Sequence, residues 1–180
     1  MDAIDTQSIH DEMERARAKF HQFLADASDA DLRRPSNGTR WTNEQLLFHM
    51  MFGYLIVRVL PVLVRVVGRL PDRVGKSFAR LLDAAVRPFD MVNFWGSVGG
   101  ARVFNRRRMG PKLDRIVASL HRRLDAESEA DLARGMHYPR RWDPFFLDYM
   151  TLLDVYHFAT QHFDFHVQQL TLDEPASDSA

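Results

Sequence analysis

Apolar residues recur at helical spacing along most of the chain. Alternation of apolar and polar residues, the pattern typical of a half-buried strand, does not persist over a useful length. A first helix is predicted from about residue 8 to residue 27, where Ser8 and Asp11 have the spacing of a capping pair. Residues 33–40 contain Pro, Asn and Gly and are expected to form a loop. The pattern therefore predicts an all-α protein.

The second predicted helix begins after Thr42. Gln45 follows three residues later, so the pair has the spacing of a capping box. At 100° per residue, Gln45, His49 and Gly53 fall on one stripe that is expected to face inward. Pro61 is expected to kink or interrupt this helix, because it removes a backbone hydrogen bond.

The sequence after the second helix predicts three further helices. They are expected over residues 73–86, 111–127 and 143–170, and the last begins at an Asp143-Pro144 pair that suits a helix start. Residues 87–110 are rich in glycine and aromatic residues and are predicted to be irregular. The expected fold is a four-helix bundle with an extra helical and loop insertion at about 55–110. Residues 1–172 form one domain in this interpretation, and residues 173–180 form a disordered tail.

Composition narrows the class of protein. The 180 residues include 24 basic and 24 acidic side chains, so net charge gives no argument for binding nucleic acid. Cysteine is absent, which removes disulfides and thiolate chemistry of the chain itself. The charged N-terminus does not resemble a secretory signal, and residues 55–67 are too short to span a bilayer. We expect a cytoplasmic protein without a membrane span, and a homodimer contact over residues 55–70.

Three histidines carry the candidate chemistry. His162 and His166 are four residues apart and share one helix face, and His49 lies on the inward stripe of another helix. Three imidazoles hold a divalent metal and leave coordination positions open, as in catalytic zinc sites. Gln169 and Gln45 are candidate hydrogen-bond partners near these rings. The competing interpretation is that each histidine is an ordinary buried residue, because this spacing also arises by chance.

The remaining histidines fit a metal site less well. His157 points away from His162 on the same predicted helix, and the others fall at exposed, boundary or loop positions. We interpret them as solvated side chains. Gly53 leaves room beside the histidines, although ordinary helix packing explains it equally well.

Two segments resemble a known family. RWTNEQLLFHM at residues 40–50 and HFDFHVQQL at residues 162–170 resemble the DinB-like four-helix metalloprotein superfamily. The likeness rests on a Trp-Thr pair that opens the second helix, on a histidine about seven residues later and on the terminal histidine pair followed by Gln and Leu. This resemblance implies a three-histidine metal site. It also implies mycothiol- or bacillithiol-dependent transferase or isomerase activity. The separation between His49 and His162 is long for the family, and the extra length falls in the insertion.

Three functional hypotheses follow. The first is a divalent-metal-dependent enzyme that transfers or uses a low-molecular-weight thiol, with a small-molecule substrate. The second is a metal-dependent hydrolase that uses a bound hydroxide. The third is a non-catalytic stress, binding or dimerisation module with a structural or vestigial metal. Zinc, nickel and iron all accept imidazole ligands. Arg106, Arg107 and Arg108 are candidates for binding an acidic thiol or substrate, and the alternative is a solvated charge cluster.

Overall fold

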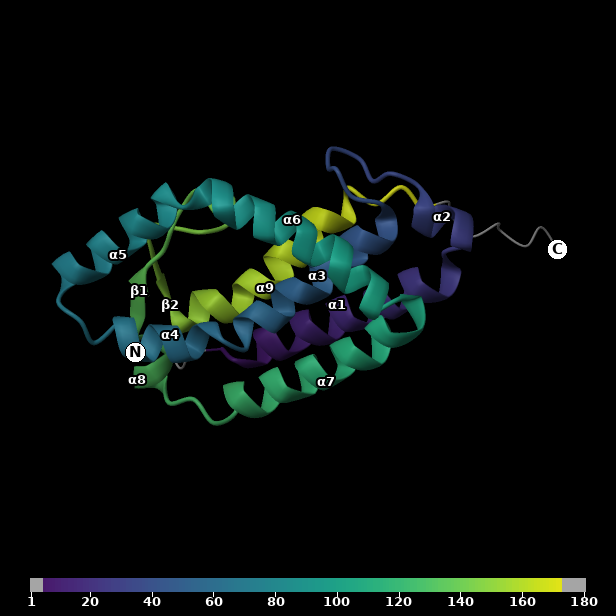
Figure 1. Ribbon diagram of the computed structural model, residues 1–180. Coiled ribbons are helices and arrows are strands. Elements are labelled where there is room, and N and C mark those ends of the chain that lie inside the picture. The colour runs from purple at the N-terminus through teal and green to yellow at the C-terminus, as the bar shows by residue number, and fades with distance from the viewer. Residues whose placement is uncertain (1–4, 173–180) are drawn as a thin grey trace.

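The computed structural model describes residues 5–172, so the predicted tail at residues 173–180 lies outside the described residues. Four long helices pack side by side, and α1 and α7 lie along the same side of the bundle in Figure 1. Around the bundle each helix contacts two neighbours, in the order α1, α7, α3, α9. The helices span Gln7–Asp26 (α1), Asn43–Val57 (α3), Arg106–Leu124 (α7) and Leu152–Val167 (α9). The predicted all-α bundle is confirmed.

Helix α3 begins at the capping box that the sequence predicts, and the helical run is interrupted before Pro61. The Thr42 hydroxyl accepts a hydrogen bond from the Gln45 backbone N–H, and the Gln45 side chain accepts one from the Thr42 backbone N–H. The helix ends at Val57, and α4 (Leu60–Val67) follows with Pro61 in its first turn. Among the described residues, 43–67 are the one stretch long and apolar enough to cross a membrane. In this fold they are divided between two helices, α3 and α4, and ten residues of α3 are buried.

The insertion is helical where the sequence suggested an irregular segment. Helix α5 spans Asp72–Ala84, and α6 spans Val86–Val103 and packs along α3. The prediction of irregular structure over residues 87–110 was therefore wrong. Glycine costs about 1 kcal/mol in a helix, and packing against α3 offsets that cost. Ser97 and Ala101 are both buried at this contact.

Helix α7 starts earlier than predicted. It begins at Arg106 rather than at Pro111, and Pro111 lies inside it. The side chain of Asn105 caps the helix by accepting a hydrogen bond from the Arg107 backbone N–H at 3.2 Å. The first helix also differs in its start, because Thr6 rather than Ser8 precedes α1 and makes no side-chain cap.

Helix α9 starts later than predicted, and this difference matters for the site. Residues before it form a strand, β2 (Tyr149–Thr151), which pairs antiparallel with β1 (Gly135–His137). The hydroxyl of Thr151 caps α9 by accepting a hydrogen bond from the Asp154 backbone N–H, and the Asp154 carboxylate accepts one from the Thr151 backbone N–H. The helix is about 24 Å long at 1.5 Å per residue. The Asp143-Pro144 pair is therefore free of the helix and lies in the connection between the two strands.

Short elements complete the chain. Helices α2 (Asp29–Arg33) and α8 (Glu129–Leu132) are both capped by serine. The loop predicted at residues 33–40 contains a turn in which Gly38 has a φ of 70°, a conformation that favours glycine. A row of valines on α4 and just before it is exposed to solvent: Val59, Val62 and Val66.

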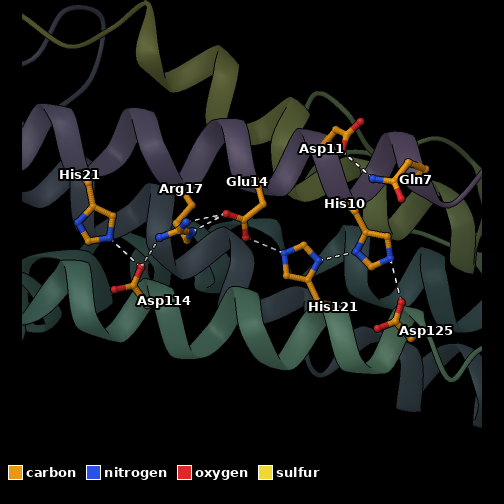
Figure 2. Close-up of polar contacts among 9 residues, drawn as sticks. All are labelled: Gln7, His10, Asp11, Glu14, Arg17, His21, Asp114, His121 and Asp125. Atoms are coloured by element: carbon orange, nitrogen blue, oxygen red, sulfur yellow. Dashed lines mark hydrogen bonds and ion pairs between the residues drawn. The ribbon is translucent and has the colours of Figure 1, made fainter.

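The seam between α1 and α7 holds histidines that the sequence suggested were solvated. Figure 2 shows His10 and His121 joined through their Nδ1 atoms at 2.5 Å. The outer nitrogen of His10 contacts Asp125, and that of His121 contacts Glu14. Elsewhere His137 is buried and His157 is half-buried, and both contact carboxylates. Solvation was thus the wrong interpretation for these side chains.

The same seam carries a carboxylate with a shifted pKa. A hydrogen bond from the Arg17 guanidinium lowers the pKa of Glu14, against the opposing effect of partial burial, and the contact with His121 adds to the lowering. The pairing of Arg17 with Glu14 is also drawn in Figure 2. Arg17 also forms an ion pair with Asp114 of α7 at 3.3 Å, so a charged contact at the surface joins the two helices in addition to the apolar core.

Candidate metal centre

Three histidine side chains meet between α3 and α9. His49 comes from α3, and His162 and His166 come from successive turns of α9. Their candidate ligand nitrogens all lie within 4.8 Å of one another, and each residue is buried, with 5–8% of its surface exposed. His162 and His166 share one face of α9 because they are four residues apart, and His49 lies on the inward face of α3. The three rings meet because α3 and α9 are direct neighbours in the bundle.

His162 is oriented by a carboxylate. Its Nδ1 lies 2.9 Å from Asp143 Oδ2, so the ring donates this hydrogen bond from Nδ1. The other carboxylate oxygen of Asp143 accepts the Phe145 backbone N–H at 2.9 Å. This tautomer leaves the lone pair on His162 Nε2, and that atom is buried without a hydrogen-bond partner in the described part of the chain. A carboxylate behind a histidine is the usual arrangement for a metal ligand.

His166 is oriented in the same way by an amide. Its Nδ1 lies 2.6 Å from Gln169 Oε1, an acceptor, so Nδ1 again carries the proton. The backbone carbonyl of Gln169 accepts the Asn37 N–H at 2.7 Å, which ties this residue to the loop before α3. The Nε2 atom of His166 is therefore the nitrogen with an available lone pair.

His49 is held by the insertion helix. Its Nδ1 lies 3.3 Å from the hydroxyl of Ser97, and Asn93 on the same helix also hydrogen-bonds the ring. Trp41 stacks on His49 with ring centroids 4.4 Å apart, and the Trp41 indole N–H donates to the Phe94 carbonyl at 3.4 Å. Helix α6 thus holds the ring directly through Asn93 and Ser97, and Phe94 holds the Trp41 side chain that stacks on it.

Burial keeps the rings of His49 and His166 neutral. It lowers the pKa of His49 well below 6.5, and the neighbouring His162 and His166 lower it further. Burial and the proximity of His162 also lower the pKa of His166, to about 4. A neutral imidazole is the form that binds a metal, so at pH 7 no proton has to leave these two rings.

The residues present fit a divalent ion. Acceptors fix the proton of His162 and His166 on Nδ1, and the freed Nε2 of His162 has no hydrogen-bond partner among residues 5–172. A cluster of three buried imidazoles without a shared ligand is costly, because each leaves polar atoms away from water. The arrangement can hold a divalent metal through His49, His162 and His166, and zinc, nickel and iron all accept imidazole ligands.

Gly53 makes space for this arrangement. A Cβ atom at this position would lie 2.7 Å from Cδ2 of the His162 ring, which is closer than real Cβ contacts. Glycine on the inward stripe of α3 therefore allows His162 to approach, as the sequence suggested.

Other residues singled out from the sequence lie elsewhere. Gln45 uses its side chain in the cap of α3. Arg106 donates hydrogen bonds to the carbonyls of Leu24 and Ala25, and Arg108 donates to the carbonyl of Val103. None of the three arginines, 106 to 108, is among the described residues that line the cavity beside the histidines.

A cavity of about 260 Å³ opens beside the three rings. His49, His162, His166 and Asp143 lie at its polar part. The rest of its wall is mostly aromatic and aliphatic, and it comes from α3, α9, the strand connection and all three helices of the insertion. The site is therefore an apolar chamber with one cluster of nitrogen ligands.

The sequence missed three residues of this site. Asp143 was interpreted as the cap of the last helix, although Thr151 and Asp154 have the spacing of a capping box and mark its true start. Asn93 and Ser97 fell in the segment interpreted as irregular, yet their four-residue spacing places them on one helix face.

Comparison with known proteins gives one finding. The sequence model of the DinB superfamily matches residues 12–170, a range that includes all three histidines. No curated protein and no solved structure matches the chain.

Proposed function

This chain belongs to the DinB superfamily, and we propose that it is a divalent-metal-dependent enzyme. His49, His162 and His166 would hold the ion through their Nε2 atoms. The observation that carries the proposal is the buried, unpartnered Nε2 of His162, on a ring whose Nδ1 is held by a carboxylate. Three protein ligands leave positions for a substrate, which favours catalysis over a closed structural site.

The finer proposal is that the nucleophile is a low-molecular-weight thiol, in an S-transferase or isomerase type of reaction. A divalent ion supplies one piece of chemistry when bound, because it lowers the pKa of a thiol or water that it coordinates. The chain contributes orientation and exclusion of water. Its own sulfur is not required, since cysteine is absent and the thiol would enter as a cosubstrate.

The occupied carboxylate of Asp143 favours a thiol over water. Both of its oxygens accept hydrogen bonds, one from the His162 ring and one from the Phe145 backbone. No other carboxylate is among the described residues that line the cavity. A hydrolase benefits from a general base beside its water, whereas a coordinated thiol is deprotonated outright. We therefore place the hydrolase second.

A metal measurement tests the foundation of the proposal. The purified protein is loaded with zinc, nickel or ferrous iron, and bound metal is measured beside His49→Ala and His162→Ala. We expect about one ion per chain, with strong loss of binding in both variants. His157→Ala is the matched control on α9, because His157 contacts Glu12 on α1 and not the cluster. Absence of metal from the unaltered protein under every loading condition would contradict the proposal.

A thiol panel then separates the three hypotheses. The metal-loaded protein is incubated with mycothiol, bacillithiol or glutathione and a set of electrophiles, and loss of free thiol is followed. Thiol-dependent turnover supports the transferase, and turnover of esters or amides without thiol supports the hydrolase. A metal-loaded protein without turnover over a broad panel supports a non-catalytic module. The cytoplasmic location and the homodimer contact stay predictions.

A further inference from the structure

The wall of the cavity beside the histidines is apolar and lacks cations. Neither lysine nor arginine is among the described residues that line it. The one carboxylate, Asp143, is occupied on both oxygens. A charged ligand would lose its hydration there without a counter-charge from the chain, whereas an apolar ligand would gain from burial.

The insertion closes part of this chamber. Trp142 in the strand connection stacks on Phe89 of α6 with ring centroids 4.0 Å apart and an interplanar angle of 10°. The Trp142 indole N–H donates to the Leu82 carbonyl of α5 at 2.8 Å. All three residues line the cavity. The insertion therefore forms part of the wall that selects what enters.

The size of the chamber suits a molecule larger than one aromatic ring. Its volume is about 260 Å³. An engineered apolar cavity of about 150 Å³ in another protein accommodates benzene. A two-ring aromatic compound or a branched hydrocarbon of similar size is therefore a reasonable occupant.

One polar atom in this wall has no explanation in the fold. Tyr138 lines the cavity and is 2% exposed, and its hydroxyl has no hydrogen-bond partner within the described residues. Burial raises the pKa of this phenol, so it stays protonated and can only be satisfied as a neutral group. A buried hydroxyl without a partner is costly. An acceptor atom on a bound ligand would remove that cost.

We infer that the cavity binds an uncharged, largely apolar small molecule that carries a hydrogen-bond acceptor such as a carbonyl oxygen, and that the Tyr138 hydroxyl donates to it. The inference rests on the proposed function in one respect, since it takes this molecule to be the substrate that meets the nucleophile at the histidines. The apolar body lies among the aromatic side chains of α3, α6 and the strand connection. The insertion therefore determines the substrate class.

Three matched naphthalenes test the inference by calorimetry on the full chain. They are 2-acetylnaphthalene, 2-ethylnaphthalene and 2-naphthoate, which share a body and differ in acceptor and charge. Metal is first removed with a chelator, so that the carboxylate cannot bind an ion at the histidines. We expect the ketone to bind at least tenfold more tightly than the carboxylate. Tyr138→Phe should reduce the preference for the ketone over the ethyl compound by about two- to tenfold.

Tyr156→Phe is the control variant. Tyr156 is equally buried but lies outside the cavity wall and contacts Glu127, so all three affinities should stay as in the unaltered chain. Tighter binding of the carboxylate, or an unchanged ketone preference in Tyr138→Phe, would overturn the inference. So would failure of all three compounds to bind. These results are independent of metal loading, so a protein that binds metal but no naphthalene contradicts this inference and leaves the proposed function intact.

Discussion

Replacement of Asp143 by asparagine changes the proton on His162 with little change in shape. In the unaltered protein, the Asp143 carboxylate accepts two hydrogen bonds, each at 2.9 Å. Oδ2 accepts from His162 Nδ1, and Oδ1 accepts from the Phe145 backbone N–H. Asparagine keeps its oxygen for the backbone N–H and turns its NH₂ group toward the ring. Nδ1 must then accept, and the ring proton moves to Nε2, the atom that faces the other histidines.

The expected cost follows from this change of tautomer. Loss of the outer partner of a metal-ligating histidine typically weakens metal binding 10- to 100-fold. This corresponds to about 1.4–2.7 kcal/mol. The free energy of unfolding of the metal-free protein should change much less, because both hydrogen bonds are kept with one reversed in direction. A selective loss of metal affinity is therefore the signature of the orienting role.

Two measurements test whether Asp143 orients His162. Competition with a chromophoric chelator gives the metal affinity, and nitrogen NMR of labelled histidines in the metal-free protein reports which ring nitrogen of His162 is protonated. Asp148→Asn is the matched control, since Asp148 contacts His137 rather than the cluster. Asp143→Asn with unchanged metal affinity and an unchanged His162 tautomer would refute the reasoning.

Three further changes have defined outcomes. Gly53→Ala places a Cβ against the His162 ring. The free energy of unfolding, measured with urea, should fall by about 1–3 kcal/mol, and metal affinity should fall as well. An unchanged unfolding midpoint would contradict the close approach of the His162 ring to Gly53. In the unaltered protein the Tyr54 and Thr160 hydroxyl oxygens lie 2.9 Å apart. Tyr54→Phe removes this partner of the buried Thr160 hydroxyl and should lower the free energy of unfolding by about 1–3 kcal/mol in the same assay. Glu14→Gln should destabilise the protein at pH 7, and the difference from the unaltered chain should shrink as the pH falls below 4.5. Because the folded state lowers the pKa of Glu14 below 4.5, its contribution is present above that pH and is lost as the pH falls through the folded pKa, and a pH-independent difference would argue against it.

The features that were predicted correctly from the sequence are those that depend on the helical spacing of nearby residues. The bundle, the cap of α3 at Thr42 and the inward position of His49 all depend on local spacing, which a single chain displays directly. Gln169 lies three residues after His166, so its contact with that ring also follows from helix geometry.

The missed features depend on contacts between distant segments. Asp143 reaches His162 because a short antiparallel pair of strands replaces the first turns of the predicted helix, and three-residue strands leave little periodicity. Helix α6 forms despite its glycines because α3 packs against it. His10 contacts Asp125 just after α7, and His121 contacts Glu14 on α1. These partners are more than 100 residues away along the chain, so the sequence around each histidine does not show them.

One face of helix α6 both contacts the His49 ring and forms part of the cavity wall. Asn93 hydrogen-bonds the ring of His49 and also lines the cavity, and Phe89 on the preceding turn forms part of the wall. Substitutions that reshape the chamber for a new ligand would therefore also disturb the orientation of a ligand histidine. Under the proposed function, ligand range and metal affinity would therefore be coupled, and laboratory evolution of one should be followed by assays of both.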